Sequence, residues 1–425
     1  MKQFLFLVFL LLTVLVSPTP ASTPDKYRNL FFSDGYLDKD DLSDAIIAYM
    51  LDEPYKGEKI NVEWLKDASH VYVYWNGNPK KIYMSDGREK VFYKPIRKII
   101  PLNPSAADAI RVLGASNLVV GIETATVKPN YLPEYLNLPL IGPGNNPNFE
   151  LIFKLDPDVV IAYVPGVYNP GYDALEAQLE PKITVVRLDF YKPETIEEEM
   201  LKLGELLGKE ERARDFIEWR KHYFNIVKER IKSVESKPRV FIDYGPGRVI
   251  TSGRLTVASN TGLHQLVEFT GGINVGADLN PSIARILSPY SPGYYAVDYE
   301  WIISQQPEII IGQASGLNSR SGGFETNDLS ALKDYYNEII SIPGIENTPA
   351  VQNKKIYIIH GDITSRLNDV VGLLFHAKWF HPDLFSDIEP LDVLQEYIDK
   401  FTSSKMNVRT QGIYVYHPEL HPNGR

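Results

Sequence analysis

The stretch KEERARDFIEWRKHYFNIVKERIKSVES, Lys209–Ser236, divides the chain into two halves of similar pattern. Its apolar residues recur at three- and four-residue steps from Ala213 to Val234, and charged residues fill the other faces. This spacing is typical of an amphipathic helix. Gly208 precedes the stretch and Pro238 follows it, which limits the helix to about 40 Å at 1.5 Å per residue. Such a helix predicts a stiff connection between two halves.

Both flanks of this helix alternate short buried strands with amphipathic helices. RKIIPLN, DVVIAYV and KITVVRLD are the clearest strands before it, and RVFIDYG, EIIIGQ and KIYIIHG are the clearest after it. This alternation favours parallel sheets flanked by helices. We therefore expect an α/β protein with two lobes of mostly parallel sheet, joined by a single long α-helix, plus a small amino-terminal accessory region.

The amino terminus, MKQFLFLVFLLLTVLVSPTP, places one Lys before an apolar run of about thirteen residues, as in a secretory signal peptide. An uncleaved anchor is the alternative. We expect an exported protein, in the periplasm or on the outer cell surface. The predicted segments are a signal peptide at 1–22, a dockerin-like helical segment at 23–66, a small β region at 67–96, an N-terminal lobe at 97–207, a linker helix at 208–237, a C-terminal lobe at 238–402 and a tail at 403–425.

Composition excludes several classes of protein. Hydrophobic residues make up 44% of the 425 residues, which is enough for two or three packed domains. A net charge of −10 disfavours a nucleic-acid binder, because phosphates would be repelled. The absence of cysteine excludes both a disulfide scaffold and a lipid-modified amino-terminal Cys.

Two amino-terminal patterns fall outside the two halves. SDGYLDKDDL, at 33–42, is similar to the second half of an EF-hand or dockerin calcium loop, with Asp34, Asp38 and Asp41 as candidate ligands. Apolar residues stand at the first and third ligand positions, so an acidic turn that caps a helix is the competing interpretation. From 70 to 95, apolar and polar residues alternate around two glycine-containing turns, which predicts β-hairpins.

A series of local matches follows in one order between Lys94 and Phe401. They are KPIRKIIPLNPSAADAIRVLGA, NPNFELIFKLDPDVVIAY, RVFIDYG with the TSG after it, LVEFTGGINV and DYEWIISQQPEIIIG. Together they resemble the helical-backbone class of ABC-transporter substrate-binding proteins, which includes receptors for ferric siderophores, haem and cobalamin. The resemblance implies a ligand held in a cleft between two lobes, and delivery to a membrane permease without any bond being made or broken.

The resemblance also implies how this chain meets its permease. In this class one acidic residue on each lobe pairs with permease arginines, and Glu150 and Glu268 occupy the matching places. A solvated surface charge is the competing interpretation for both. A monomer that contacts an ABC permease and a small-molecule metal complex, but no nucleic acid, is expected.

Residues that follow the strands of a parallel sheet are the natural ligand contacts. Tyrosine offers a large planar surface, and arginine holds carboxylates, catecholates or oxyanions with two hydrogen bonds. Tyr172 and Tyr294 lie in loops near these strand ends, and Arg254 and Arg320 lie in loops of the second lobe. The candidate ligand-binding residues are Asn103, Ser105, Tyr163, Tyr168, Tyr244, Arg248 and Arg366.

The expected ligand is a metal chelate, and no covalently bound cofactor is predicted. GPGNNPN and Tyr163 stand where the cobalamin receptor has Trp, which argues against cobalamin. The resemblance then implies a ferric siderophore, the more frequent ligand in this class, with cobalamin, haem and a molybdate-like oxyanion as alternatives. Two readings belong to other classes, a chelatase-like enzyme and a calcium-dependent surface interaction protein. The enzyme is disfavoured because the chain has no Cys, no G-x-S-x-G elbow and no G-x-x-x-x-G-K loop.

Overall fold

The computed structural model describes residues 23–164, 172–246, 253–282, 285–286, 293–315 and 321–425. The chain forms two compact units. The first unit is Met1–Lys81 with Lys90–Pro95, and the second is Ile82–Glu89 with Ile96–Arg425. The predicted signal peptide at 1–22 lies outside the described residues.

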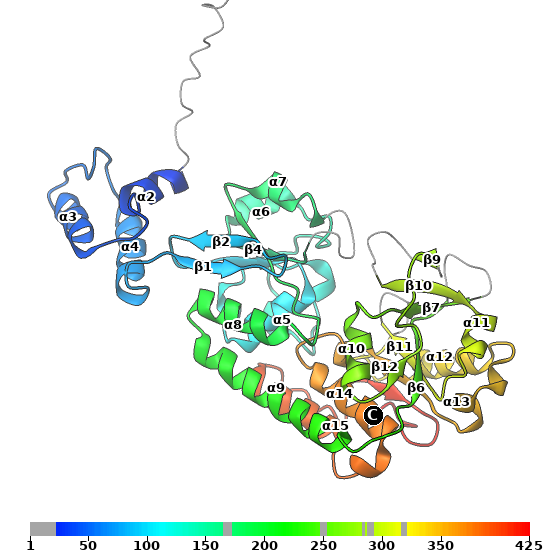
Figure 1. The fold of residues 1–425 in the computed structure, drawn as a ribbon. Coiled ribbons are helices and arrows are strands. Elements are labelled where there is room, and N and C mark those ends of the chain that lie inside the picture. Colours follow the sequence, from blue (N-terminus) through cyan, green and yellow to red (C-terminus); the bar gives the residue numbers. More distant parts are fainter. Residues whose placement is uncertain (1–22, 165–171, 247–252, 283–284, 287–292, 316–320) are drawn as a thin grey trace, which may run out of the picture. The chain divides into compact units, whose positions relative to one another are not determined.

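The described part of the first unit contains three helices around a small aromatic core (Figure 1). They are α2 (Thr23–Phe31), α3 (Lys39–Met50) and α4 (Val62–Tyr74). Asn61 caps α4, because its side chain accepts a hydrogen bond from the Trp64 backbone N–H at 2.9 Å. Tyr27 and Phe31 are buried in the core, and their ring centroids lie 5.1 Å apart.

The β region predicted at 67–96 is wrong over its first part, because α4 extends to Tyr74. Val71 and Val73 alternate with tyrosines as in a strand, yet Leu65, Ala68 and Val71 bury one helical face at three-residue steps. Only the second turn belongs to a hairpin, formed by β1 (Lys80–Tyr83) and β2 (Glu89–Phe92).

The N-lobe carries the first parallel sheet of the second unit, with the order β3-β4-β5. Isolated parallel bridges from Ile99 to Val119 and from Ile122 to Leu140 extend this sheet. Every residue of β3 and β4 is buried, as expected of strands covered on both faces. The elements of the N-lobe are β3 (Ile99–Pro101), α5 (Pro104–Val112), η1 (Ser116–Leu118), η2 (Thr124–Thr126), η3 (Pro133–Tyr135), α6 (Phe149–Leu155), β4 (Val159–Ala162), α7 (Leu175–Leu179), β5 (Thr184–Arg187) and α8 (Ile196–Leu207).

The C-lobe contains a sheet of order β13-β12-β11-β6-β8, parallel except for β13, and an antiparallel sheet of order β7-β10-β9. The strands are β6 (Arg239–Asp243), β7 (Gly253–Val257), β8 (Ile273–Asn274), β9 (Arg285–Ile286), β10 (Tyr294–Asp298), β11 (Ile309–Ala314), β12 (Ile356–His360) and β13 (Val415–Tyr416). The helices are α10 (Gly262–Phe269), α11 (Tyr299–Ser304), α12 (Ser330–Ile340), η6 (Ile345–Asn347), α13 (Pro349–Gln352), η7 (Gly361–Ile363), α14 (Asp369–Phe380), η8 (Pro382–Leu384) and α15 (Pro390–Phe401).

The tail predicted at 403–425 is part of the C-lobe. Its β13 pairs antiparallel with β12, with Ile358 opposite Tyr416 and Ile359 opposite Val415. Antiparallel pairing at the edge of a parallel sheet is common in mixed sheets. The expected separate tail is therefore corrected to an edge strand.

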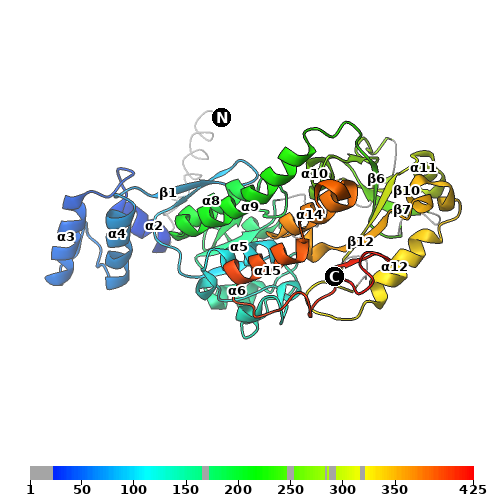
Figure 2. The ribbon, with the colours of Figure 1, turned by 90° about the horizontal axis from the view of Figure 1, so that it is seen from below.

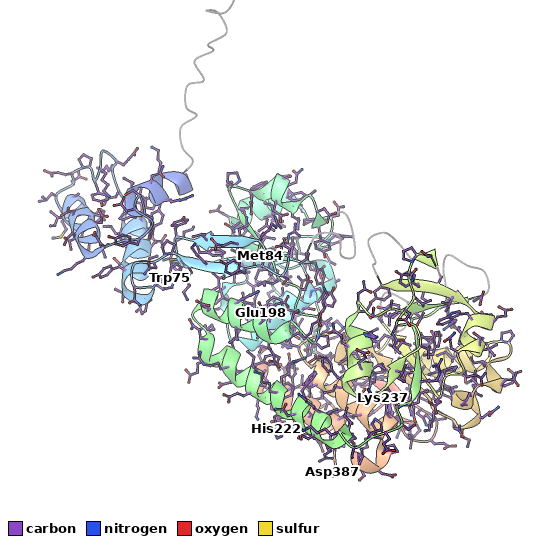
Figure 3. All side chains as sticks on the ribbon, viewed as in Figure 1. Trp75, Met84, Glu198, His222, Lys237 and Asp387 are labelled. Atoms are coloured by element: carbon purple, nitrogen blue, oxygen red, sulfur yellow. The ribbon has the colours of Figure 1, made fainter. Side chains whose placement is uncertain are left out.

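The helix predicted between the halves is α9 (Glu210–Ile231), and His222 marks it in Figure 3. Arg220 is buried on α9 and donates to Asp369 of α14 at 2.8 and 3.1 Å and to Glu197 of α8 at 3.0 Å. Both lobes are thus tied to one helix. The α/β fold of two lobes with mostly parallel sheets is confirmed.

Helix α9 is accompanied by α15, which lies beside it (Figure 2). The Trp219 and Tyr397 rings are 5.6 Å apart, and the Tyr397 hydroxyl donates to Asp108 of α5 at 3.2 Å. The chain therefore returns to the N-lobe before β13 joins the C-lobe sheet, and α9 is not the sole link between the lobes. Within the described ranges, no helix has the length and apolar character needed to cross a membrane.

Candidate functional site between the lobes

Tyrosines from both lobes meet at the carboxyl ends of the strands. We call them the interlobe tyrosine cluster: Tyr163, Tyr172 and Tyr191 from the N-lobe, and Tyr244 and Tyr294 from the C-lobe. The Tyr163 ring lies 5.5 Å from Tyr172 and 5.8 Å from Tyr191, and Tyr244 lies 5.1 Å from Tyr294. Burial and the nearness of Tyr244, Tyr191 and Tyr163 raise the pKa of Tyr294, so the two groups of rings lie close to each other.

The phenol groups of this cluster are neutral hydrogen-bonding groups. Burial raises the pKa of Tyr163, while a hydrogen bond from Ser105 opposes that change. Burial also raises the pKa of Tyr244, which bonds Ser315 and Tyr294. Tyr163, Tyr244 and Tyr294 nevertheless keep part of their surface exposed. Partly exposed neutral phenols suit a large ligand with an apolar body and polar edges.

Asn103 and Ser105 lie at the amino end of α5, next to the cluster. The Asn103 side-chain oxygen accepts from the Ala106 N–H at 2.6 Å and caps the helix, and Pro104 stands at its first position. Asn103 is fully buried, yet its Nδ2 has no hydrogen-bond partner among the described residues. Buried polar groups normally have a partner, so this donor is available to a ligand or to water.

Arg366 approaches the same region from the C-lobe. Its Nε donates to Asp362 at 3.3 Å, its guanidinium lies 5.8 Å from the Tyr131 ring centre, and its buried Nη1 lacks a partner within the described part of the chain. Burial would raise the pKa of Asp362, but the charges of Lys128, His360 and Arg366 hold it well below its usual range. The Nε of Arg366 is therefore committed to Asp362, while its Nη1 is available to a ligand.

Contacts across the lobes surround this ion group. Lys128 of the N-lobe donates to both Asp362 oxygens at 2.5 and 2.7 Å. Tyr131 stacks on Phe324 of the C-lobe with centroids 3.9 Å apart, and Glu325 accepts from the Tyr131 N–H at 3.1 Å. The structure thus joins the lobes by direct contacts as well as through α9 and α15.

Glu123 is a buried carboxyl near the same end of the N-lobe sheet. It accepts from the Thr126 hydroxyl at 2.8 Å and the Ala125 N–H at 3.1 Å, which makes it the cap of η2. Burial raises its pKa, and these hydrogen bonds oppose the change. These contacts show that Glu123 acts as the cap of η2.

The remaining predicted site residues divide into three groups. Tyr168, Arg248 and Arg320 lie outside the described residues. Arg254 is buried and bonds Asp243, which corrects its expected position in a surface loop. Glu150 on α6 and Glu268 on α10 are exposed, and Glu268 lies 3.2 Å from His264 Nε2.

Two of the calcium candidates, Asp38 and Asp41 at the start of α3, have other partners. Asp38 caps the helix by accepting from the Asp41 N–H at 2.7 Å. Asp41 itself pairs with Lys56 at 2.9 Å and accepts from the Tyr55 hydroxyl at 2.9 Å. Among the described residues, His, Cys, Asp and Glu side chains form no group of three or more that could hold a metal ion. The helix-capping interpretation accounts for Asp38.

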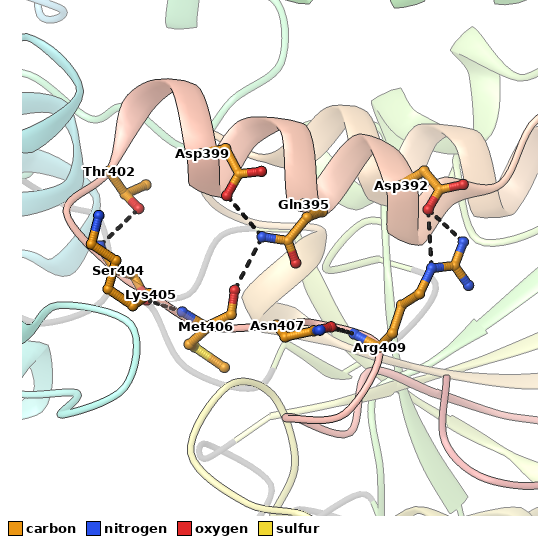
Figure 4. A pocket seen from close by; sticks show the side chains of 9 residues that line it. All are labelled: Asp392, Gln395, Asp399, Thr402, Ser404, Lys405, Met406, Asn407 and Arg409. Carbon is orange, nitrogen blue, oxygen red and sulfur yellow. Dashed lines mark hydrogen bonds and ion pairs between the residues drawn. The ribbon is translucent and has the colours of Figure 1, made fainter.

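Two surface depressions lie along α15, and the tyrosines of the cluster line neither of them. In the first, Gln395 donates to Asp399 at 2.9 Å and to the Met406 carbonyl at 3.0 Å, so its polar groups hold the following turn (Figure 4). The second is formed by α9 and α15. The first is lined by Asp392, Gln395, Asp399, Thr402, Ser404, Lys405, Met406, Asn407 and Arg409.

Comparison with known proteins gives this fold a family. Residues 99–363 match the family described as periplasmic binding protein. The chain belongs to the periplasmic binding protein family. Members of this family are extracytoplasmic substrate-binding proteins of transporters rather than enzymes, so the chelatase interpretation does not hold.

Named relatives and solved structures add detail about similarity. A cobalamin-binding protein of Halobacterium salinarum is 27% identical over 221 residues, covering 50% of this chain and 53% of the relative. A vitamin B12-binding protein of Pectobacterium atrosepticum is 26% identical over 227 residues, covering 52% of this chain and 72% of the relative. The chain thus spans about half the length of the Halobacterium protein and more of the Pectobacterium one.

Solved structures share the fold. A TroA-like periplasmic binding protein from Veillonella parvula has a TM-score of 0.63 at 22% identity, covering 80% of this chain and 99% of that one. A Helicobacter pylori protein solved with Ni(II) bound, CeuE, has a TM-score of 0.57 at 19% identity, covering 77% and 97%.

Sequence reasoning missed Tyr191, Lys128 and Arg187. Tyr191 follows the strand end of β5 and could have been found by the rule that selected Tyr163. Arg187 ends the strand TVVR, and a charge at a buried strand position is a signal of a specific partner. Lys128 carried no signal, because its partner Asp362 lies 234 residues away.

Proposed function

We propose that this chain is the extracytoplasmic substrate-binding protein of an ABC importer and captures a metal chelate between its lobes. The observation that carries the proposal is the interlobe tyrosine cluster beside two buried donors, Asn103 Nδ2 and Arg366 Nη1, that have no partner among the residues the structure describes. A chelate offers an apolar rim for the rings and oxygen acceptors for the donors. Walls formed by packed helices and strands need little ordering when the ligand binds.

A ferric siderophore is the proposed ligand, because the arginine favours anionic oxygens. Cobalamin is the second candidate, and the names of the curated relatives favour it. Its amide side chains would also accept hydrogen bonds from Asn103 and Arg366. The two candidates differ in charge, so only an anionic siderophore would form an ion pair with Arg366.

The test is quenching of intrinsic fluorescence by a panel of ferric siderophores, cobalamin, haem and molybdate, together with mass spectrometry of the natively purified protein. We expect one chelate to bind with a Kd of about 1 µM or tighter, which corresponds to about −8 kcal/mol. Tyr163→Ala and Tyr244→Ala should weaken binding. Tyr74→Ala, a change at a 73% exposed ring on α4, is the matched control. Failure of every ligand to bind would overturn the proposal.

Charge dependence separates the two candidates. Arg366→Met should weaken the binding of an anionic siderophore much more than the binding of cobalamin, because only the siderophore loses an ion pair. If cobalamin binds tightly and every siderophore binds weakly, the ligand is a corrinoid and the siderophore assignment is wrong. Arg366→Lys keeps the charge but loses the planar donor pair, and serves as the intermediate case.

We also propose that Glu150 and Glu268 dock the loaded protein on its permease, and that a leader or anchor at 1–22 keeps a monomer outside the cytoplasm. Exposed charges mainly affect association rate and its salt dependence. The double variant E150A/E268A should slow uptake and reduce its salt dependence, while ligand affinity stays unchanged. E211A/E300A removes two other exposed glutamates from first turns of helices and should leave uptake intact. Normal uptake by E150A/E268A would exclude the docking role.

A further inference from the structure

The tip of the hairpin, residues 82–89, belongs to the same compact unit as the lobes. The Ser85 N–H donates to the Arg187 carbonyl at 2.9 Å, and the Arg187 N–H lies 3.2 Å from the Met84 sulfur. Met84, labelled in Figure 3, is 2% exposed. The tip therefore lies against the end of β5, where the chain turns toward Tyr191.

Arg187 carries the first path from the tip to the tyrosine cluster. Its side chain is fully buried and donates to the Tyr163 carbonyl at 2.6 Å and to the Tyr172 carbonyl at 2.6 Å. Its Nε donates to Glu176 at 2.8 Å, and a second, shorter bond joins the same two groups. One guanidinium thus fixes the backbone of two tyrosines in the cluster.

Arg88, on the hairpin tip, completes this path. Its Nη2 donates to Glu176 at 2.9 Å, while its Nε donates to Asp86 at 2.7 Å. Burial would raise the pKa of Glu176, but hydrogen bonds from Arg187 and Arg88 lower it to about 2, so this carboxylate is charged at neutral pH. Glu176 is therefore held between an arginine of the tip and an arginine of the cluster's support.

Ser85 and Glu199 form a second path. The Ser85 hydroxyl donates to Glu199, whose carboxylate accepts from the Asp189 N–H at 3.2 Å and the Phe190 N–H at 2.6 Å. Phe190 has a φ of +55°, which is unfavourable for a bulky side chain and needs support from its surroundings. The next residue is Tyr191, whose ring contacts Tyr163. The two paths therefore converge on the N-lobe half of the cluster.

We infer that the hairpin tip is a positioning element for the ligand site: Arg88 and Ser85 orient Tyr163, Tyr172 and Tyr191 through Arg187, Glu176 and Glu199. This inference rests on the proposed function. Residues 82–89 thereby gain a role in the ligand site. The sequence pattern alone indicated only an accessory hairpin. Neither Arg88 nor Ser85 contacts the ligand in this arrangement; both act through groups behind the tyrosines.

The test compares S85A/R88M with the unaltered protein in two measurements. Ligand affinity should fall about tenfold. Losses of this size follow when the groups that orient the coordinating residues of a metal site are removed. In the ligand-free protein, the ring resonances of Tyr163, Tyr172 and Tyr191 should shift, while those of Tyr335 and Tyr397, which lie outside the cluster, should stay in place. S85T/R88K keeps the hydroxyl and the charge and should restore both values.

The matched control is Arg230→Met, which removes a comparable arginine whose Nη1 and Nη2 bond Asp387 at 2.5 and 2.8 Å. It should change neither affinity nor the cluster resonances. If S85A/R88M fails to fold, the single variants S85A and R88M are measured separately by the same criteria. Unchanged affinity together with unchanged resonances would overturn the inference. If the unaltered protein binds no chelate, the proposed function fails, while the resonances still decide whether the tip positions the tyrosines.

Discussion

The two lobes support their tyrosines with buried arginines in different surroundings. In the N-lobe, Arg187 donates to the backbone of Tyr163 and Tyr172, and its carboxylate partner Glu176 is 19% exposed and shared with Arg88. In the C-lobe, Arg254 pairs with the fully buried Asp243, the residue directly before Tyr244.

The C-lobe arrangement is built from groups of the C-lobe itself, and Arg254 also bonds Glu338 of α12, whose side chain is 31% exposed. Arg254 donates to Asp243 at 2.7 and 2.8 Å, Tyr335 donates to the same carboxylate at 2.6 Å, and the Gly245 N–H donates to it at 2.8 Å. Gly245 has a φ of +100°, which only glycine adopts readily, so the turn after Tyr244 is fixed by its own backbone and by Asp243. The N-lobe relies instead on a hairpin outside the sheet. The comparison teaches that the C-lobe side of the site is supported by its own lobe. The N-lobe side also depends on the hairpin tip, so changes in the tip should affect it.

The largest expected loss of unfolding free energy is in the C-lobe. Arg254→Met leaves the fully buried Asp243 without its guanidinium partner, and removal of one partner of a buried pair costs about 3–5 kcal/mol. Urea unfolding monitored by circular dichroism measures the loss. If Arg254→Met loses less unfolding free energy than Arg187→Met in the N-lobe, the proposed difference between the lobes is wrong.

Arg187→Met should cost less, about 2–3 kcal/mol, because two buried carbonyls lose a donor while Glu176 keeps Arg88. The same unfolding assay applies, with the slope against urea checked for a change in the denatured state. Ligand affinity should fall more for this variant than its stability loss implies, since Tyr163 and Tyr172 both lose their support.

Acid should weaken the N-lobe wall by a smaller amount. The folded-state pKa of Glu176 is lowered from 4.5 to about 2, so its contribution is present above pH 4.5 and is lost as the pH falls toward 2. After allowance for solvent screening we expect about 1–2 kcal/mol. The difference in unfolding free energy between the unaltered protein and Glu176→Gln should shrink across this window. A difference that stays constant with pH would contradict the assignment.

Arg88→Met should have the smallest effect on stability, below about 1 kcal/mol, because its pair with Glu176 is half-exposed. Thermal unfolding with Arg230→Met as the reference variant measures it. A loss as large as that of Arg187→Met would mean that the tip is part of the N-lobe core rather than an adjustable support.

The sequence predicts the parts of this molecule that rest on local periodicity. The apolar spacing from Ala213 onward places α9 within a few residues, and the strand-end rule selects Asn103, Tyr163 and Tyr244. The helix through Val71 and Val73 was missed, because β-branched and aromatic residues there mimic a strand while three-residue burial decides the structure.

Pairings between distant segments could not be predicted. Arg254 and Asp243 are eleven residues apart and meet because β7 folds back beside β6. Arg88 and Glu176 are 88 residues apart, and no local pattern in either segment indicates the other. The return of α15 to Asp108 depends in the same way on tertiary packing.

The short edge strands of the C-lobe sheet have a consequence for how the protein behaves at high concentration. Both edges, β8 (Ile273–Asn274) and β13 (Val415–Tyr416), are two residues long. An unpaired apolar strand offers its backbone to another molecule, and β12 (Ile356–His360) would be such a strand without β13. By covering Ile358 and Ile359, the final segment of the chain protects the C-lobe against self-association, and its displacement should start aggregation through β12.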